Sequence, residues 1–89
     1  MAAVTFTAAL GRYVDAPPAQ PTGGTVREVF ETYFRSYPQV RSYVLDDQGA
    51  VRKHVAIFLN GVLIRDRVRL TDVVGEADEI YVVQALSGG

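Results

Sequence analysis

The sequence predicts an α+β domain in which one main helix covers a mixed sheet of four or five strands. Three observations point to this class. One segment has the apolar spacing of an amphipathic helix, several short segments alternate with a period of two, and an Asn-Gly pair separates two of those segments. Because the helix has a single apolar stripe, it needs one apolar sheet face to cover it.

The composition is that of one small globular domain. The chain has 89 residues, of which 48% are hydrophobic and 21% charged, and its formal net charge is −1. No apolar run approaches the ~20 residues that a membrane-spanning helix needs, and the nine basic residues are scattered, so we expect neither membrane nor nucleic-acid binding. The sequence contains no cysteine, which excludes disulfides and thiolate chemistry and makes the reducing cytoplasm the expected location.

The N-terminal part should hold the first strand and a long loop. Residues 2–10 contain alternating apolar and threonine positions and are expected to form a half-buried strand. Residues 11–24 contain three prolines and three glycines, and are therefore expected to be a loop. A short strand at residues 19–22 would have to lie at a sheet edge because of Pro21.

Residues 25–36 should form the main helix. Thr25 and Glu28 have the spacing of a capping box. Apolar and aromatic side chains then recur along one helical stripe, at Val26, Val29, Phe30, Tyr33, Phe34 and Tyr37. Pro38 should end the helix near Ser36.

The next segments should form a hairpin. A turn at residues 46–49 precedes a strand at residues 51–59, in which apolar side chains alternate. Asn60-Gly61 is a two-residue hairpin signal, and residues 62–66 would supply the returning strand.

The remaining residues should complete the sheet and end in a tail. Residues 70–74 are expected to make a single helical turn, residues 76–79 an acidic turn, and residues 80–86 the final strand. The domain would therefore comprise residues 1–86, and residues 87–89 would be a flexible Ser-Gly-Gly tail.

Strand alternation predicts an outward apolar surface. The side chains that should face the helix are Val55, Ile57, Leu59, Ile80 and Val82. Phe58, Tyr81 and Val83 would then face outward with Ala56, and these three together with Leu86 are the expected partner-binding residues. The alternative is that they are ordinary exposed apolar residues without a partner.

Few other side chains suggest chemistry. His54 is the only histidine and has no cysteine or second histidine to share a metal, so no metal site is expected. The sequence shows no pattern of a nucleophile and a general base that is typical of an enzyme, so no catalytic residue is predicted. Arg65, Arg67 and Arg69 alternate and are interpreted as a solvated strand edge that discourages edge-to-edge pairing.

The pattern resembles the β-grasp, or ubiquitin-like, fold and, more narrowly, the prokaryotic sulfur carriers. These include the small subunit of molybdopterin synthase and the sulfur carriers of thiamine and cysteine biosynthesis. The resemblance lies mainly in VAIFLNG at residues 55–61 and in EADEIYVVQALSGG at residues 76–89. The chain departs from the family pattern at Ala77, where the acidic turn usually has glycine, and at Gln84-Ala85, where proline is common.

The resemblance implies that Gly89 is the reactive residue. Its carboxylate is inert toward nucleophiles at neutral pH, so a separate E1-like enzyme would use ATP to form an acyl-adenylate. Sulfide transfer would then give a thiocarboxylate. Ser87 and Gly88 would provide access, because three extended residues reach about 10 Å and glycine lets enzyme walls close on the backbone.

The resemblance also implies the partners. No cofactor is expected to be bound by the chain itself, which is expected to be a monomer when free and not an enzyme. Its partners would be the adenylating enzyme and a biosynthetic enzyme that accepts the sulfur, in a cysteine, molybdopterin or thiamine type of pathway.

Two other functions stay open. A ubiquitin-like modifier conjugated through Gly89 would share the activation step, although Lys53 as the only lysine leaves little room for self-linked chains. The second alternative is a β-grasp binding module in which the terminal glycines have no role. A native terminus beyond Gly89 would favour this alternative.

Overall fold

The computed structural model describes residues 2–84, whose strands form one mixed sheet in the order β1-β4-β2-β3. The strands are β1 (Ala3–Phe6), β2 (Val55–Leu59), β3 (Val62–Leu63) and β4 (Glu79–Gln84). β4 runs parallel to β1 and antiparallel to β2, and β2 and β3 form an antiparallel hairpin. The predicted α+β class is confirmed, with four strands in the described part of the chain.

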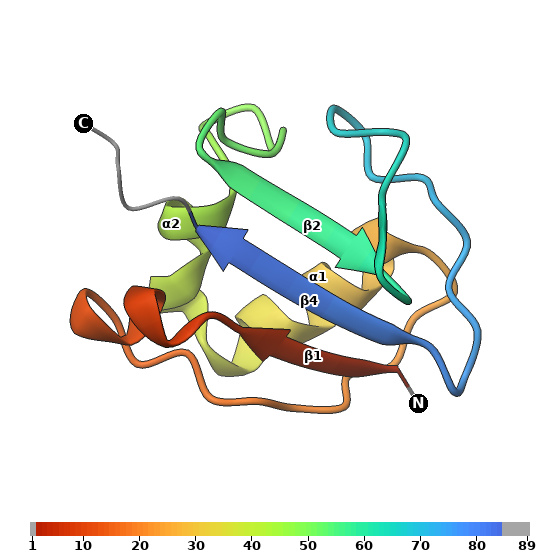
Figure 1. Ribbon diagram of the computed structural model, residues 1–89, viewed down its shortest axis with the longest axis horizontal. Coiled ribbons are helices and arrows are strands. Elements are labelled where there is room, and N and C mark those ends of the chain that lie inside the picture. Colours follow the sequence, from red (N-terminus) through yellow and green to blue (C-terminus); the bar gives the residue numbers. More distant parts are fainter. Residues whose placement is uncertain (1, 85–89) are drawn as a thin grey trace.

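One face of the sheet is covered by helix α1 (Val26–Ser36) (Figure 1). The other helical segments are short: η1 (Ala8–Arg12), η2 (Pro38–Val40) and α2 (Arg41–Val44). The main helix ends at Ser36, as the following proline predicts. The short helix α2 was not predicted, because four residues carry too little periodicity to reveal a helix.

The start of α1 has the predicted capping arrangement with one shift. The Glu28 N–H donates to Thr25 Oγ1 at 3.2 Å, as a capping box requires. The Glu28 side chain accepts from the Gly24 N–H at 2.8 Å, one residue earlier than in the standard box. Both interactions satisfy N–H groups around the helix start.

The core lies between α1 and the inner face of the sheet. Its largest fully buried side chains are Tyr33, Phe30, Leu10, Ile57, Leu70 and Ile80. The Tyr33 hydroxyl donates to the Pro17 carbonyl at 2.7 Å, and burial raises the pKa of this phenol. This bond fastens the proline-rich loop to the helix.

The strands predicted at residues 2–10 and 51–59 are both shorter in the structure. The first ends at Phe6, because the chain turns into η1 and buries Leu10 instead of continuing along the sheet. The strand predicted at residues 51–59 is β2, which begins only at Val55. Val51 makes an isolated bridge to Leu45. In the proline-rich loop, Ala19 likewise makes a single bridge to β1, so no full strand forms there.

The Asn60-Gly61 turn is confirmed. Asn60 and Gly61 have φ angles of 52° and 83°, as a type I′ turn requires, and they join β2 to β3. The returning strand ends at Leu63, so the three alternating arginines do not lie on a strand edge as predicted. Arg67 instead donates to the Arg52 carbonyl at 2.7 Å.

The prediction of a helical turn at residues 70–74 is wrong. This segment is not helical: Leu70 has a φ of 55°, and Val73 bridges to Thr25. Beside it, the Arg27 N–H donates to the Leu70 carbonyl and the Val26 N–H to the Asp72 carbonyl. The first N–H groups of a helix have no partner within the helix. A neighbouring segment that offers free carbonyls satisfies these N–H groups better than another helical turn would.

The last predicted strand corresponds to β4, which begins at Glu79. Ala85 and Leu86 lie outside the described residues, as does the predicted tail. Within residues 2–84, no helix combines the length and apolar character needed to cross a bilayer.

Candidate functional site: the outer sheet patch

The predicted reactive tail follows β4 in the sequence. Leu86, Ser87, Gly88 and Gly89 lie outside the described residues, so their predicted roles rest on the sequence. β4 ends at Gln84, which pairs with Val55 at the start of β2. The last described residue before the tail therefore lies beside the first residue of β2.

The outward face of the sheet carries an apolar surface next to this end of β4. Phe58 lies opposite Tyr81, and Ala56 lies opposite Val83. Tyr81 is 42% exposed, and the other three side chains are half-buried. The predicted orientation is confirmed, because the inward neighbours Val55, Ile57, Ile80 and Val82 are each at most 2% exposed.

Leu63 extends this surface and was missed in the sequence. It lies opposite Phe58 in the hairpin and is 54% exposed. The two-residue turn at Asn60-Gly61 fixes this register, so the pairing of Leu63 with Phe58 was available from the turn signal alone. We call Ala56, Phe58, Leu63, Tyr81 and Val83 the outer sheet patch.

Polar groups border the patch at both ends. One shallow hollow between Phe58 and Tyr81 reaches Asn60, Gly61 and Glu79. A second, between Ala56, Leu63 and Val83, is bordered by Lys53, His54 and Arg67. An apolar centre with a polar rim is the usual layout of a protein-binding surface.

The only lysine and the only histidine lie together near the exit of β4. Lys53 and His54 are exposed and directly precede Val55, the residue paired with Gln84. The exposure of His54 agrees with its interpretation as a solvated residue. The basic end of the patch is thus the end from which the chain continues toward Gly89.

The acidic residues mainly hold turns together. Asp66 accepts hydrogen bonds from the Arg69 N–H at 2.9 Å and the Thr71 hydroxyl at 2.6 Å, which lower the pKa of its carboxyl group to about 2. The Gly75 N–H donates to Asp78 at 2.7 Å and is the main cause of a lowered pKa there too. Both carboxylates are therefore structural acceptors.

Metal ligands do not gather in the described part of the chain. Among residues 2–84, no group of three or more histidine, cysteine, aspartate or glutamate side chains could hold a metal ion. The candidate site next to the end of β4 therefore consists of the outer sheet patch and its polar rim.

The sequence of this domain matches a known family over almost its whole length. Residues 5–89 match the ThiS family, so the match includes the final glycines as well as the described domain. The chain belongs to the ThiS family. Its family and fold are thus those of the ubiquitin-like β-grasp proteins that the sequence resemblance implies.

Solved structures share the fold. A chain of the BexX/CysO complex of Amycolatopsis orientalis aligns with a TM-score of 0.83 and 16% identity, covering 100% of both chains. CysO of Mycobacterium tuberculosis aligns with a TM-score of 0.80 and 17% identity over 97% of this chain and 100% of the other. SAMP1 of Haloferax volcanii aligns at 0.76 and 22% identity over 99% and 98%.

At these identities the similarity to solved structures establishes the β-grasp fold of the ThiS-family chain. A search of curated proteins gives no match. One of the neighbours bears the name small archaeal modifier protein 1, which describes a modifier.

Proposed function

We propose that the chain is a sulfur carrier whose Gly89 carboxyl group is adenylated by a partner enzyme and converted to a thiocarboxylate. The match to the ThiS family through residue 89 is the observation that carries this proposal. The outer sheet patch beside the end of β4 supports it, because a partner acting on Gly89 needs a surface near the tail to hold.

The chemistry takes two displacement steps. An oxygen of the Gly89 carboxylate attacks the α-phosphorus of ATP and displaces pyrophosphate, which gives an acyl-adenylate. Hydrosulfide, or an enzyme that delivers sulfur at the same oxidation level, then attacks the acyl carbon and loses its proton. The carbon–sulfur bond forms, the bond to AMP breaks, and a thiocarboxylate remains.

The chain supplies the acceptor carboxylate and a docking surface, and the partner supplies the ATP site and the catalytic groups. The sequence has no cysteine, so no thiol of this chain can compete for the sulfur. Gly88 places no side chain next to the reacting carbon, which favours entry into a narrow active site. A second enzyme would accept the sulfur from the thiocarboxylate.

The outer sheet patch is proposed as the surface that the adenylating enzyme binds. Its apolar centre can be buried in a complex, and Glu79 at one end and Lys53 and Arg67 at the other can fix the orientation. Leu86 is proposed to continue this contact along the tail. One solved neighbour is a complex, BexX/CysO, which accords with a carrier that works bound to another protein.

Conjugation to other proteins is the second candidate. The similarity to small archaeal modifier protein 1 favours it, and the same acyl-adenylate would serve both reactions. In that case a lysine amine, instead of hydrosulfide, would displace AMP and form an amide.

Mass spectrometry of the intact protein tests the proposal. The chain ending at Gly89, incubated with ATP, a cognate adenylating enzyme and sulfide, should gain the mass difference between sulfur and oxygen. Fragmentation should place the gain at Gly89. Reactions without ATP are the control and should leave the mass unchanged.

The two candidates give different products. A complete reaction that forms the acyl-adenylate but never replaces its AMP by sulfur would refute the sulfur carrier. Amide-linked adducts on lysines of other proteins, without any sulfur-containing product, would establish the modifier in its place.

A further inference from the structure

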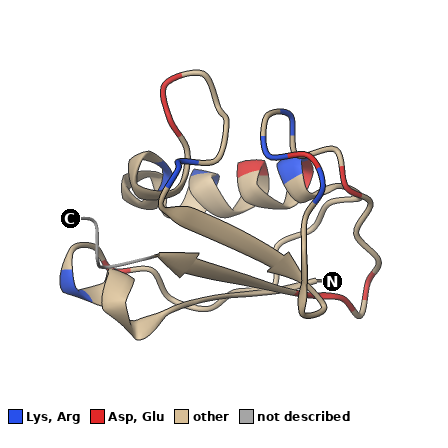
Figure 2. Cartoon of the chain, turned by 45° about the horizontal axis from the view of Figure 1, so that its top comes forward, with Lys and Arg blue, Asp and Glu red and all other residues tan. Residues whose placement is uncertain are grey.

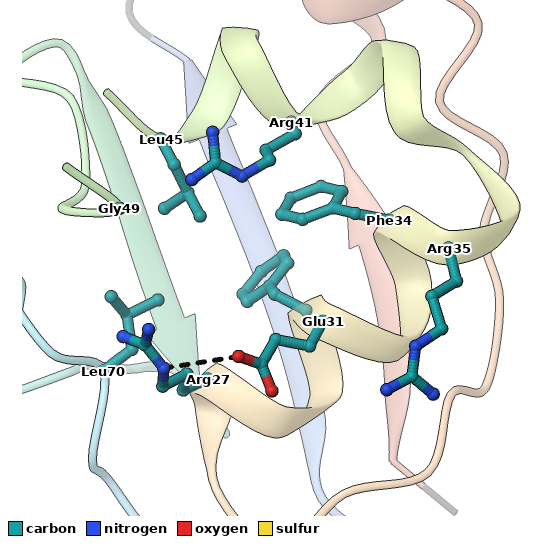
Figure 3. Close-up of a pocket in the computed structure, with 9 residues that line it drawn as sticks. Arg27, Glu31, Phe34, Arg35, Arg41, Leu45, Gly49 and Leu70 are labelled. Atoms are coloured by element: carbon teal, nitrogen blue, oxygen red, sulfur yellow. Dashed lines mark ion pairs between the residues drawn. The ribbon is translucent and has the colours of Figure 1, made fainter. Parts of the chain in front are cut away.

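A second concave surface lies on the helix side of the domain. A hollow of about 460 Å³ opens between α1, α2, the turn at Gly49 and the loop that ends at Leu70 (Figure 3). Its floor is apolar and consists of Phe30, Phe34, Leu45 and Leu70, which are between 1% and 8% exposed. These side chains belong to the core, so the floor is rigid.

The rim of the hollow is basic. Arg27, Arg35 and Arg41 line it and are exposed, and Glu31 is the only acidic residue among the lining side chains. Glu31 forms an ion pair with Arg27 at 3.4 Å. Within the described residues 2–84, Arg35 and Arg41 have no ion-pair partner.

The basic rim does not follow from the overall composition. The chain as a whole has a net charge of −1, yet three of its cationic side chains surround one apolar floor. The nearby turn after α2 contains Asp46, whose carboxylate accepts from the Gln48 and Ala50 N–H groups at 2.8 and 3.1 Å and so is directed into its own turn. Figure 2 shows the arginine positions on α1 as separate from this acidic turn.

We propose that this hollow binds an acidic peptide segment of a partner protein, with an apolar side chain on the floor and carboxylates at Arg35 and Arg41. Planar guanidinium groups match carboxylates through paired hydrogen bonds. Because the rim side chains are exposed, a small ligand would remain largely in water, whereas small-molecule sites bury most of the ligand surface. A peptide can cover the open side with its own backbone.

This site is separate from the outer sheet patch. α1 covers the inner face of the sheet, and the patch lies on the opposite face (Figure 1). A peptide bound over Phe34 therefore does not compete with a partner bound over Tyr81. The domain can hold two partners at once, and the inference does not depend on the reaction at Gly89.

The test is an NMR titration of the isotope-labelled full chain with a synthetic peptide of sequence EEFLEE, blocked at both ends. Amide signals around Phe34, Arg41 and Leu70 should shift, while those of Phe58 and Tyr81 should not. Peptides KKFLKK and EEGGEE should bind far more weakly, because one reverses the charge and the other removes the apolar side chains.

Charge-reversal variants complete the test. The double substitution R35E/R41E should weaken EEFLEE binding by about tenfold or more. The control R12E/R65E makes the same change in net charge at two exposed arginines outside the hollow and should keep most of the affinity. Absence of binding at millimolar peptide, shifts on the outer sheet patch, or equal losses in the two double variants would each overturn the proposal.

Discussion

Phe58 lies directly opposite Tyr81 in the antiparallel pairing of β2 with β4, and both side chains face away from α1. Their chain neighbours Ile57 and Ile80 are fully buried on the other face. The two residues are therefore a cross-strand pair at the surface, where a polar replacement disturbs packing far less than in the core.

Phe58→Asp and Tyr81→Asp should each leave the domain folded and weaken binding to the adenylating enzyme. The new carboxylate would have to lose its water in the complex without gaining a partner. Thermal melting and binding titrations of the same preparations measure the two effects separately. Tyr81→Asp should have the smaller effect on melting, since Tyr81 is 42% exposed.

Val73→Asp is the matched control for this pair. Val73 is 78% exposed and lies beside the start of α1, away from the patch. It should change neither melting nor binding appreciably. Equal losses of binding in all three variants would show that the patch has no particular role.

Deletion of Gly89 should nearly abolish thiocarboxylate formation. The terminal carboxylate would be drawn back by about 3.3–3.6 Å, a large displacement on the scale at which reacting groups must be placed. Addition of one alanine after Gly89 should have the same result, because the reactive carboxylate becomes an amide. Intact-protein mass spectrometry checks both, and full conversion of the deletion variant would contradict the role of Gly89.

Asp66→Asn should make the domain less stable at neutral pH and reduce the loss of stability on acidification. Hydrogen bonds from the Arg69 N–H and the Thr71 hydroxyl lower the pKa of Asp66 from 3.8 to about 2 in the folded state. The unfolded state therefore binds more protons in this interval, so the stabilisation is complete above about pH 4 and is lost as the pH falls toward about 2.

Urea unfolding between about pH 5 and about pH 2 measures this slope. Asp47→Asn is the control, since Asp47 is exposed and its carboxylate accepts no hydrogen bond within the described residues. Asp78 has a lowered pKa as well, so part of the slope should persist in Asp66→Asn. Identical pH profiles for wild type and Asp66→Asn would contradict the assigned hydrogen bonds.

Gly23→Ala should destabilise the domain by about 1–3 kcal/mol, the usual cost of forcing an extra methyl group into a packed site. An added Cβ would lie 2.5 Å from the Val29 nitrogen and 2.8 Å from the Glu28 carbonyl carbon, and helix backbone cannot move aside. Gly11→Ala is the control, because nothing lies within 4 Å of its added Cβ. Chemical denaturation should separate the two variants clearly.

The elements that sequence predicted best are those with a local physical cause. Thr25, Glu28 and Pro38 define both ends of α1, and Asn60-Gly61 defines the hairpin and its register. The alternation of Phe58 and Tyr81 with buried neighbours then placed the outward patch correctly. Its role as a binding surface stays a prediction.

The elements that were missed depend on contacts between distant segments. Residues 70–74 do not form a helical turn because the Leu70 and Asp72 carbonyls accept from the first turn of α1. The Asp72 carboxylate also accepts from the Arg65 and Asp66 N–H groups at 2.9 Å. Such bonds leave no periodic pattern. The basic hollow was missed for the same reason, since its lining residues come from four separate segments.

The central position of β4 has a consequence for how the chain is made. β1 and β2 each bond to β4 and not to one another, so the two halves of the sheet remain unconnected until Glu79–Gln84 is available. During synthesis these residues leave the ribosome after every other described element, and the closing contacts span nearly the whole domain. A chain released before this point cannot complete its sheet. In the proposed function, a partner that binds across β2 and β4 therefore recognises only a finished and folded copy.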